Sequence, residues 1–220
     1  METVNNEISQ KMLKSNTSIV GIVCQDGIVM AGDRRATAGN LIASKIEKKV
    51  RPINDYLVVS WTGGVSDAQL STKIITAELR LNELKTCARS TISEAANFIA
   101  LSFYKSIRTP SMVPHMVGFL VAGLNEDGST ELYSIEPSGS ILKIEDFDAN
   151  FSSGMPYILG LLERQYDKKI VVKDGIELAK ECIKSAIERD SGSGNGIDVF
   201  TITKDGVKHV VSEEIVPQYK

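Results

Sequence analysis

The stretch Thr17-Ser18-Ile19-Val20-Gly21-Ile22-Val23 decides the fold, because it is rich in β-branched residues and is followed by the turn Gln25-Asp26-Gly27. Ile28-Val29-Met30-Ala31-Gly32 then returns the chain with the same apolar character. Two such runs on either side of an Asp-Gly turn predict a β-hairpin. We therefore expect the folded body of the protein to begin near Thr17.

The segment before this hairpin differs from the rest of the chain. Residues 1–16 are polar, carry Glu2 and Glu7, and lack the apolar core of a secretory signal. They are interpreted as a leader, for which a flexible tail is the simplest alternative. The longest apolar run of the protein, residues 116–124, is too short to span a bilayer. The sequence thus predicts neither a signal peptide nor a membrane span.

After the hairpin, strand-like and helix-like segments come in groups. The residues Leu70, Ile74, Ala77, Leu81 and Leu84 recur at the spacing of one helix face, which predicts a helix with this stripe buried. A second helix is expected from Thr91, where Thr91 and Glu94 can form a capping box. Two later helices are expected at about residues 156–166 and 175–189. Strands are expected at residues 41–43, 48–53, 56–62, 116–124, 131–135, 140–144, 197–203 and 207–211.

This order of strands, two helices, strands, two helices and strands is typical of the α+β class. Two strand groups and two helix pairs predict stacked sheets with helices on both outer faces. No change of composition divides the body, so residues 17–220 are expected to form one domain.

Composition excludes several function classes. The 220 residues include 42% hydrophobic and 24% charged residues, which is ordinary for a globular protein with a large core. There are 25 Lys and Arg residues against 28 Asp and Glu residues, so the net charge of −3 argues against a nucleic-acid binder. His115 and His209 are the only histidines, and no metal site is expected around them. Three scattered cysteines indicate a reducing compartment.

Amide hydrolysis without a histidine requires another base. An N-terminal Ser, Thr or Cys can use its own α-amine, which titrates near pH 8 and is partly neutral at physiological pH. Inside a peptide bond the same nitrogen is not a base. A Thr at the head of a buried strand is usually structural, so Thr17 alone is a weak signal.

Several ordered motifs together resemble the proteasome β subunits, especially the archaeal ones. The resemblance runs from about Thr17 to Val211. Its motifs are Thr17-Ser18-Ile19-Val20-Gly21-Ile22, Gly32-Asp33-Arg34-Arg35-Ala36-Thr37, Lys48-Lys49, Gly63-Gly64-Val65-Ser66-Asp67-Ala68-Gln69, Ser152-Ser153-Gly154-Met155-Pro156, Arg189-Asp190-Ser191-Gly192-Ser193-Gly194 and Gly196-Ile197-Asp198.

The resemblance implies an N-terminal-nucleophile hydrolase with an αββα sandwich. It also implies stacked heptameric rings with proteasome α subunits and other β subunits, located in the cytoplasm. A regulatory ATPase would act through the α ring and deliver unfolded polypeptides. No cofactor, metal, nucleic acid or membrane is implied.

Residue roles follow from the same resemblance. Thr17 matches the nucleophile that is exposed when the bond between Asn16 and Thr17 is cut. Lys49 matches the lysine that favours the deprotonated hydroxyl and the neutral amine, and Asp33 matches its acidic partner. Gly63 matches the glycine whose N–H faces the developing oxyanion. Asp190, Ser193 and Ser153 match the polar network around the terminal amine.

The substrate site is also inferred from the resemblance. Ala36, Glu47, Lys49, Trp61 and Val65 match positions that line the pocket for the residue before the cut. Thr37 matches a residue whose backbone pairs with an extended substrate. Trp61 usually has a smaller counterpart in the family. We hypothesise that its bulk disfavours large substrate side chains; core packing is the alternative.

Each role has a simpler structural alternative. Asp33 beside Arg34 and Arg35 could form a solvated salt-bridge cluster, and Lys49 could lie on an exposed strand edge. The Gly63-Gly64 pair could be a plain turn. Residues 191–196 could be a flexible loop, and Ser152-Ser153 could cap the following helix.

Two positions depart from the family pattern. Asn16 stands where self-processing members usually have Gly, which takes backbone conformations that Asn adopts less readily. The Ser152-Ser153-Gly154-Met155 motif is less rich in glycine and serine than in other members of the family. This departure argues against the hydroxyl network that the resemblance implies around Ser153. Three hypotheses stay open: an active threonine peptidase, a structural β subunit that keeps its leader, and a small-molecule amidohydrolase on the same fold.

Overall fold

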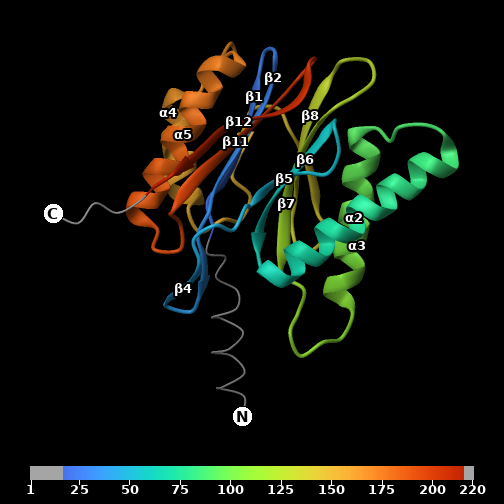
Figure 1. Ribbon diagram of the computed structural model, residues 1–220, viewed down its shortest axis with the longest axis horizontal. Coiled ribbons are helices and arrows are strands. Elements are labelled where there is room, and N and C mark those ends of the chain that lie inside the picture. Colours follow the sequence, from blue (N-terminus) through green and yellow to red (C-terminus); the bar gives the residue numbers. More distant parts are fainter. Residues whose placement is uncertain (1–16, 216–220) are drawn as a thin grey trace.

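The computed structural model describes residues 17–215 of the chain. Within this part the chain forms four helices, two five-stranded antiparallel sheets and a small two-stranded hairpin. Figure 1 shows four layers side by side, with a helix pair on each outer face and the two sheets between them. This α-β-β-α sandwich is the predicted α+β fold. The expected leader and Asn16 lie outside the described residues.

The first sheet has the strand order β10-β1-β2-β11-β12. In β1 and β2, Ile19 is paired with Gly32, and Asp33 at the end of β2 is paired with Ile197 of β11. The start of β1, the end of β2 and the start of β11 therefore meet at one end of the sheet. The strands are β1 (Ile19–Cys24), β2 (Gly27–Asp33), β10 (Phe147–Asp148), β11 (Gly196–Thr203) and β12 (Gly206–Glu214).

The second sheet has the order β5-β6-β7-β8-β9. Its strands are β5 (Val50–Pro52), β6 (Leu57–Gly63), β7 (Val117–Leu124), β8 (Thr130–Ile135) and β9 (Ile141–Ile144). The separate hairpin consists of β3 (Ala36–Ala38) and β4 (Leu41–Ser44). The short strands β3 and β10 were not predicted, because three and two residues are too few to show an alternating pattern.

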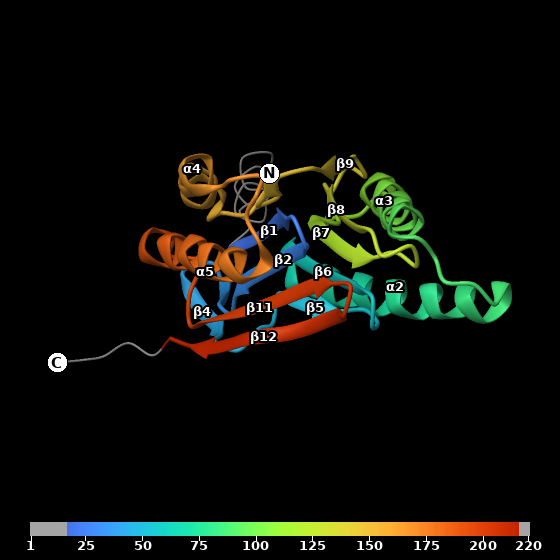
Figure 2. The ribbon, with the colours of Figure 1, turned by 90° about the horizontal axis from the view of Figure 1, so that it is seen from above.

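Helices α2 (Val65–Thr86) and α3 (Ile92–Arg108) cover the second sheet, and α4 (Met155–Gln165) and α5 (Val172–Arg189) cover the first, as Figure 2 shows from above. The predicted capping box is present at the start of α3, where Thr91 and Glu94 each accept a backbone N–H. Helix α5 starts earlier than expected. It includes Gly175, where an added Cβ would lie 2.7 Å from the Cys24 Sγ.

Three apolar clusters hold the layers together. One lies between the sheets and contains Ile19, Met30 and Leu120. A second joins the second sheet to α2 and α3, and a third joins the first sheet to α4 and α5. Each layer therefore buries apolar side chains against its neighbours, which is the condition for a stable stacked architecture.

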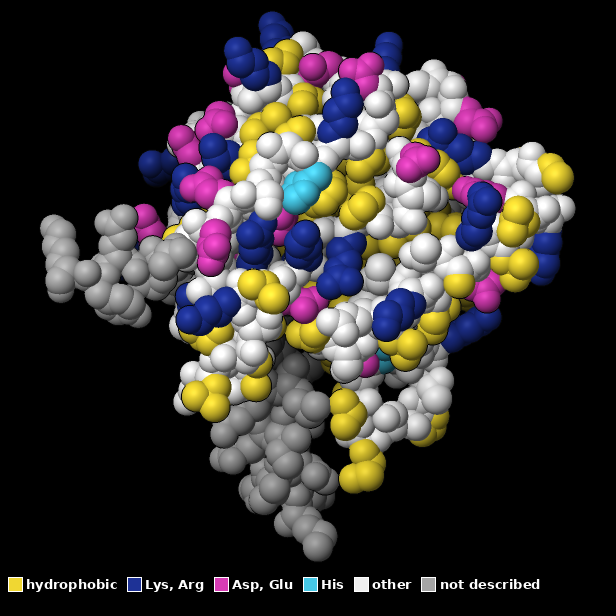
Figure 3. Space-filling model, viewed as in Figure 1, with side chains coloured by type: hydrophobic (Ala, Val, Ile, Leu, Met, Phe, Trp, Pro, Cys, Tyr) yellow, Lys and Arg dark blue, Asp and Glu magenta, His cyan; other side chains and the backbone are white. Residues whose placement is uncertain are grey.

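The predicted buried stripe of α2 is wrong. Leu70, Ile74, Leu81 and Leu84 are 60%, 47%, 42% and 63% exposed, and Ala77 is also exposed. The buried residues of α2 are instead Ala68, Ile75 and Leu79, which lie on a neighbouring face. Figure 3 shows hydrophobic side chains along the outer side of this helix. Periodicity identified the helix but could not say which of its two apolar faces contacts the sheet.

None of the helices formed by residues 17–215 combines the length and the apolar character needed to cross a membrane.

Candidate active site

Thr17 lies two residues before the start of β1 and is 1% exposed. The backbone N–H of Thr17 donates to Ser153 Oγ at 2.9 Å, and its carbonyl oxygen accepts from the Gly154 N–H at 3.2 Å. Both partners belong to the loop before α4. This loop therefore fixes the backbone of Thr17 on both sides of its Cα atom.

Asp33 ends β2 and is fully buried. Its Oδ1 accepts from Lys49 Nζ at 2.7 Å and from the Ser18 N–H at 2.9 Å. Its Oδ2 accepts from the Arg35 N–H at 2.9 Å and from the Gly194 N–H at 2.8 Å. Four donors are therefore directed at one buried carboxyl group.

Lys49 lies just before β5, with its side chain 1% exposed. Burial lowers the pKa of its ammonium group, while Asp33, Asp190 and Glu47 oppose this shift through their charges. Asp33 Oδ1 therefore links the buried Lys49 amine to the backbone N–H of Ser18, the residue that follows Thr17.

A second polar group contacts Thr17 through Ser153. Ser153 Oγ and Ser193 Oγ each donate to Asp190 Oδ2 at 2.6 Å. Asp190 ends α5, and Ser193 lies in the loop before β11 with no exposed surface. The Ser153 network is therefore formed despite the unusual Ser152-Ser153-Gly154-Met155 motif.

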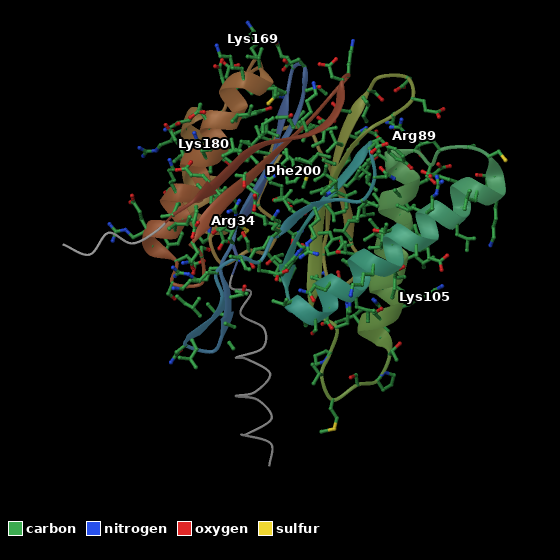
Figure 4. All side chains as sticks on the ribbon, viewed as in Figure 1. Arg34, Arg89, Lys105, Lys169, Lys180 and Phe200 are labelled. Atoms are coloured by element: carbon green, nitrogen blue, oxygen red, sulfur yellow. The ribbon has the colours of Figure 1, made fainter. Side chains whose placement is uncertain are left out.

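The solvated salt-bridge alternative for Asp33 is wrong. Arg34 binds the buried Asp198 instead, with its Nε at 2.8 Å and its NH2 at 2.6 Å from the two carboxylate oxygens. Figure 4 labels Arg34 near the strands β11 and β12. The bond between Arg34 and Asp198 connects β11 to the end of β2. The Arg35 side chain binds Asn195 Oδ1 and the Ser191 carbonyl, both at 2.9 Å.

The other structural alternatives also differ from the structure. Lys49 is buried, so it does not belong to an exposed strand edge. The residue that begins α4 as its N-cap is Gly154, so neither Ser152 nor Ser153 caps this helix. In the supposed flexible loop, residues 192–196 are buried and Ser193 and Asn195 make the bonds given above.

Gly63 and Gly64 form the junction between β6 and α2 rather than a plain turn. Gly63 has a φ of +108°, and an added Cβ would lie 2.1 Å from the Met116 carbonyl oxygen. That oxygen also accepts the Gly64 N–H at 2.9 Å. Only glycine fits position 63, for reasons of both conformation and space.

Of the residues expected to line the substrate pocket, Trp61 contacts Lys49 directly, and Glu47 acts on it through its charge. The Trp61 N–H donates to the Lys49 carbonyl at 3.1 Å, and the Glu47 N–H donates to the Arg34 carbonyl at 3.0 Å. Glu47 Oε1 binds Arg51 at 3.0 Å and Gln69 at 3.3 Å. Trp61 is 1% exposed and belongs to the cluster under α2 and α3; Ala36 is also buried, while Val65 and Thr37 are partly buried.

Comparisons with known proteins identify the family. The family described as proteasome subunit matches residues 13–202. The chain belongs to the proteasome subunit family. A protein of Methanopyrus kandleri named proteasome subunit beta is 40% identical over 204 residues, which cover 92% of this chain and 95% of the relative. Proteins of the same name from Archaeoglobus profundus and Methanosarcina mazei are 40% and 38% identical, covering 95% and 94% of this chain and 94% and 95% of the relatives.

Four residues of this proteasome subunit contact the site without having been predicted as site residues. Ser18, Arg35 and Gly194 hold Asp33 through their backbone N–H groups, and Gly154 holds Thr17. All four lie within the motifs of the resemblance. The only signal in the sequence was that each lies one or two positions from a predicted site residue, because these contacts use backbone groups that every residue type except proline has.

The site of this proteasome subunit contains two carboxylates, one buried amine and several hydroxyl groups. Among residues 17–215, no three His, Cys, Asp or Glu side chains are grouped as a metal ion would need. The arrangement suits proton transfer and nucleophilic attack by an oxygen atom.

Proposed function

We propose that this chain is a β subunit of a 20S proteasome core particle and a threonine endopeptidase that degrades unfolded polypeptides. Activity requires cleavage between Asn16 and Thr17. One observation carries the proposal: the Ser153–Asp190–Ser193 group contacts the Thr17 nitrogen, and the Asp33–Lys49 pair contacts the N–H of the next residue, Ser18.

After cleavage the Thr17 nitrogen becomes a primary amine and the base of the reaction. Its lone pair takes the proton of the Thr17 hydroxyl as Oγ attacks the substrate carbonyl carbon. Lys49 stabilises the negative charge that develops on Oγ, and Asp33 fixes the position of Lys49 through their 2.7 Å contact. The Gly63 N–H stabilises the oxyanion, a contribution worth about 2.7–4 kcal/mol for one donor.

The proton on the Thr17 amine then goes to the leaving nitrogen of the substrate, which departs as an amine. A water molecule hydrolyses the acyl group on Thr17 Oγ and restores the free hydroxyl. Each proton taken from a nucleophile is thus returned to a leaving group, and no external oxidant or cofactor is consumed.

Assembly into a proteasome core follows from family membership, and the finer arrangement belongs to the proposal. We expect stacked heptameric rings with α subunits and other β subunits, and an ATPase that acts through the α ring. The described cysteines Cys24, Cys87 and Cys182 are free, which fits the reducing cytoplasm. Substrate binding through the backbone of Thr37 would add a strand to β3.

Asn16 favours a second candidate, a structural β subunit that keeps its leader and has no activity. Glycine is the more adaptable residue at a strained junction, so Asn can slow or prevent the cleavage. The two candidates differ in one observable, the mass of the assembled subunit.

Co-expression with the α subunit, followed by intact-mass analysis of assembled particles, tests the proposal. Loss of residues 1–16 together with peptide hydrolysis supports the peptidase, whereas full retention in inactive particles supports the structural subunit. Thr17→Ala should abolish hydrolysis and leave assembly intact. Thr201→Ala, at another buried threonine, is the control and should keep activity. Hydrolysis by pure Thr17→Ala particles would place the nucleophile elsewhere.

A further inference from the structure

Ser18 contacts both halves of the active site. It is fully buried, and its backbone N–H donates to Asp33 Oδ1 at 2.9 Å. Its Oγ lies 2.7 Å from Ser193 Oγ. One residue therefore joins the Asp33–Lys49 pair to the group around Asp190.

The direction of the hydrogen bond between Ser18 and Ser193 follows from counting hydrogen atoms. A serine hydroxyl has one hydrogen, and an ionised carboxylate can only accept. Ser193 uses its hydrogen for Asp190 Oδ2 at 2.6 Å, so Ser18 must be the donor to Ser193. Ser153 Oγ lies within reach of two acceptors, Asp190 Oδ2 at 2.6 Å and the Thr17 carbonyl oxygen at 3.1 Å, and its one hydrogen is assigned to the shorter contact. Ser153 Oγ also accepts from the Thr17 N–H.

These bonds form one chain in which every donor is directed towards Asp190. It runs from Ser18 through Ser193 to Asp190 on one side, and from Thr17 through Ser153 to Asp190 on the other. Within the first branch the hydrogen bonds polarise one another, so the donation from Ser18 strengthens the bond from Ser193 to Asp190. The two branches meet on the same oxygen, Asp190 Oδ2.

Packing holds the Ser18 hydroxyl in place. A Cβ added to Gly154 would lie 1.9 Å from Ser18 Oγ and 3.0 Å from Ser18 Cβ. The side chain of Ser18 thus occupies space that only a glycine at position 154 leaves open. Gly154 also donates to the Thr17 carbonyl, so the same loop positions both residues.

We propose that Ser18 is a positioning residue for the reaction, whose hydroxyl is the outermost donor of the branch that runs through Ser193 to Asp190. Asp190 is the carboxylate that Ser153 links to the Thr17 nitrogen. The inference rests on the proposed peptidase function. By strengthening the donation of Ser193, Ser18 draws negative charge away from Asp190. This makes the cleaved Thr17 amine easier to deprotonate, and only the neutral amine can act as base.

Ser18→Ala tests this role, because it removes the hydroxyl and keeps the N–H that binds Asp33. In processed particles we expect kcat to fall about fivefold, the rate equivalent of one ordinary hydrogen bond, with KM unchanged. The acid limb of the kcat/KM profile should move up by about 0.3 pH unit. The charged groups of the site, namely Asp190 after α5, Asp33 at the end of β2 and Lys49 before β5, remain in this variant.

Ser60→Ala is the matched control, since Ser60 is also fully buried and its Oγ has no hydrogen-bond partner within residues 17–215. It should leave kcat and the pH profile unchanged. Ser18→Thr keeps the hydroxyl, so the acid limb of its kcat/KM profile should lie at the same pH as in the wild type. Ser18→Cys, which replaces a strong donor by a weak one at similar size, provides the same measurement if the alanine variant fails to assemble.

A double-mutant cycle separates this role from general packing. If Ser18 acts through Ser193, Ser18→Ala should add no further loss of kcat to a Ser193→Ala particle. Additive losses, or a Ser18→Ala particle with the kcat and acid limb of Ser60→Ala, would overturn the inference. An inactive wild-type particle would instead refute the proposed function itself, so the two failures are distinguishable.

Discussion

Lys49 Nζ lies 2.7 Å from Asp33 Oδ1, and both side chains are sealed from solvent, with exposed fractions of 1% and 0%. Transfer of two charges out of water is costly, and it is offset only where each charge keeps its partner and further hydrogen bonds. Asp33 meets this condition through the N–H groups of Ser18, Arg35 and Gly194. The pair is therefore sensitive to the removal of either partner.

Lys49→Met should abolish peptide hydrolysis and lower the free energy of unfolding by about 3–5 kcal/mol, because it leaves the Asp33 carboxylate buried without a counter-charge. Lys143→Met is the control: its bond to Glu131 is an ion pair in which the Lys143 side chain is 54% exposed, worth about 1 kcal/mol or less. Thermal or denaturant unfolding measures the stability of both variants. Equal stability of the two variants would contradict the buried-pair interpretation.

Gly63→Ala should lower stability and activity together. The new Cβ would have to occupy a site 2.1 Å from the Met116 carbonyl oxygen, with φ at +108°. Gly128→Ala is the matched control, because Gly128 also has a positive φ, of +84°, but open space around it. Gly128→Ala should lower the free energy of unfolding by about 1–3 kcal/mol through its backbone conformation alone, and Gly63→Ala should lower it by clearly more. A Tm for Gly63→Ala equal to that of the control would rule out the steric effect.

His115 should make the protein less stable in mild acid. Burial lowers the pKa of its imidazole below the ordinary value of 6.5, and Asp67 opposes this shift only in part. Between the lowered pKa and 6.5 the unfolded chain binds more protons than the folded chain, so the free energy of unfolding falls as the pH decreases through this window.

His115→Gln removes the titrating group and should flatten this dependence. Its Tm should therefore fall less than that of the wild type between pH 7 and pH 5. Measurements at each pH by differential scanning calorimetry provide the test, and parallel Tm curves for the two proteins would show that another group is responsible.

Trp61→Gly should change both stability and specificity. Loss of a buried indole costs about 3–5 kcal/mol in comparable Trp→Ala substitutions, and Trp61 is 1% exposed in the core under α2 and α3. If its bulk also limits the pocket beside Lys49, the variant should cleave peptides with aromatic residues before the cut better, relative to small ones. Fluorogenic peptides measure this ratio. An unchanged ratio in a folded variant would leave core packing as its sole role.

The sequence predicted most strands and all four described helices, because alternation, capping signals and turn residues are local properties. The capping box of Thr91 and Glu94 is such a case. The buried face of α2 was predicted wrongly, since the choice between Leu70 and Ile75 as core residues depends on what packs against the helix. Among residues 17–215, β3 and β10 were missed because they exist only through pairing with other segments.

The sequence alone determined the residue types of the site and their order. Thr17 at the start of a hairpin, a chain with two histidines, and the motifs around Asp33, Lys49 and Asp190 were sufficient to predict the fold and the reaction class. Only the tertiary structure decided how these groups meet. Ser18 and Ser193 are 175 positions apart, yet their hydroxyls lie 2.7 Å from each other. Such a contact depends on β1 and the loop before β11 being brought to the same end of one sheet by pairing through β2, which no local pattern encodes.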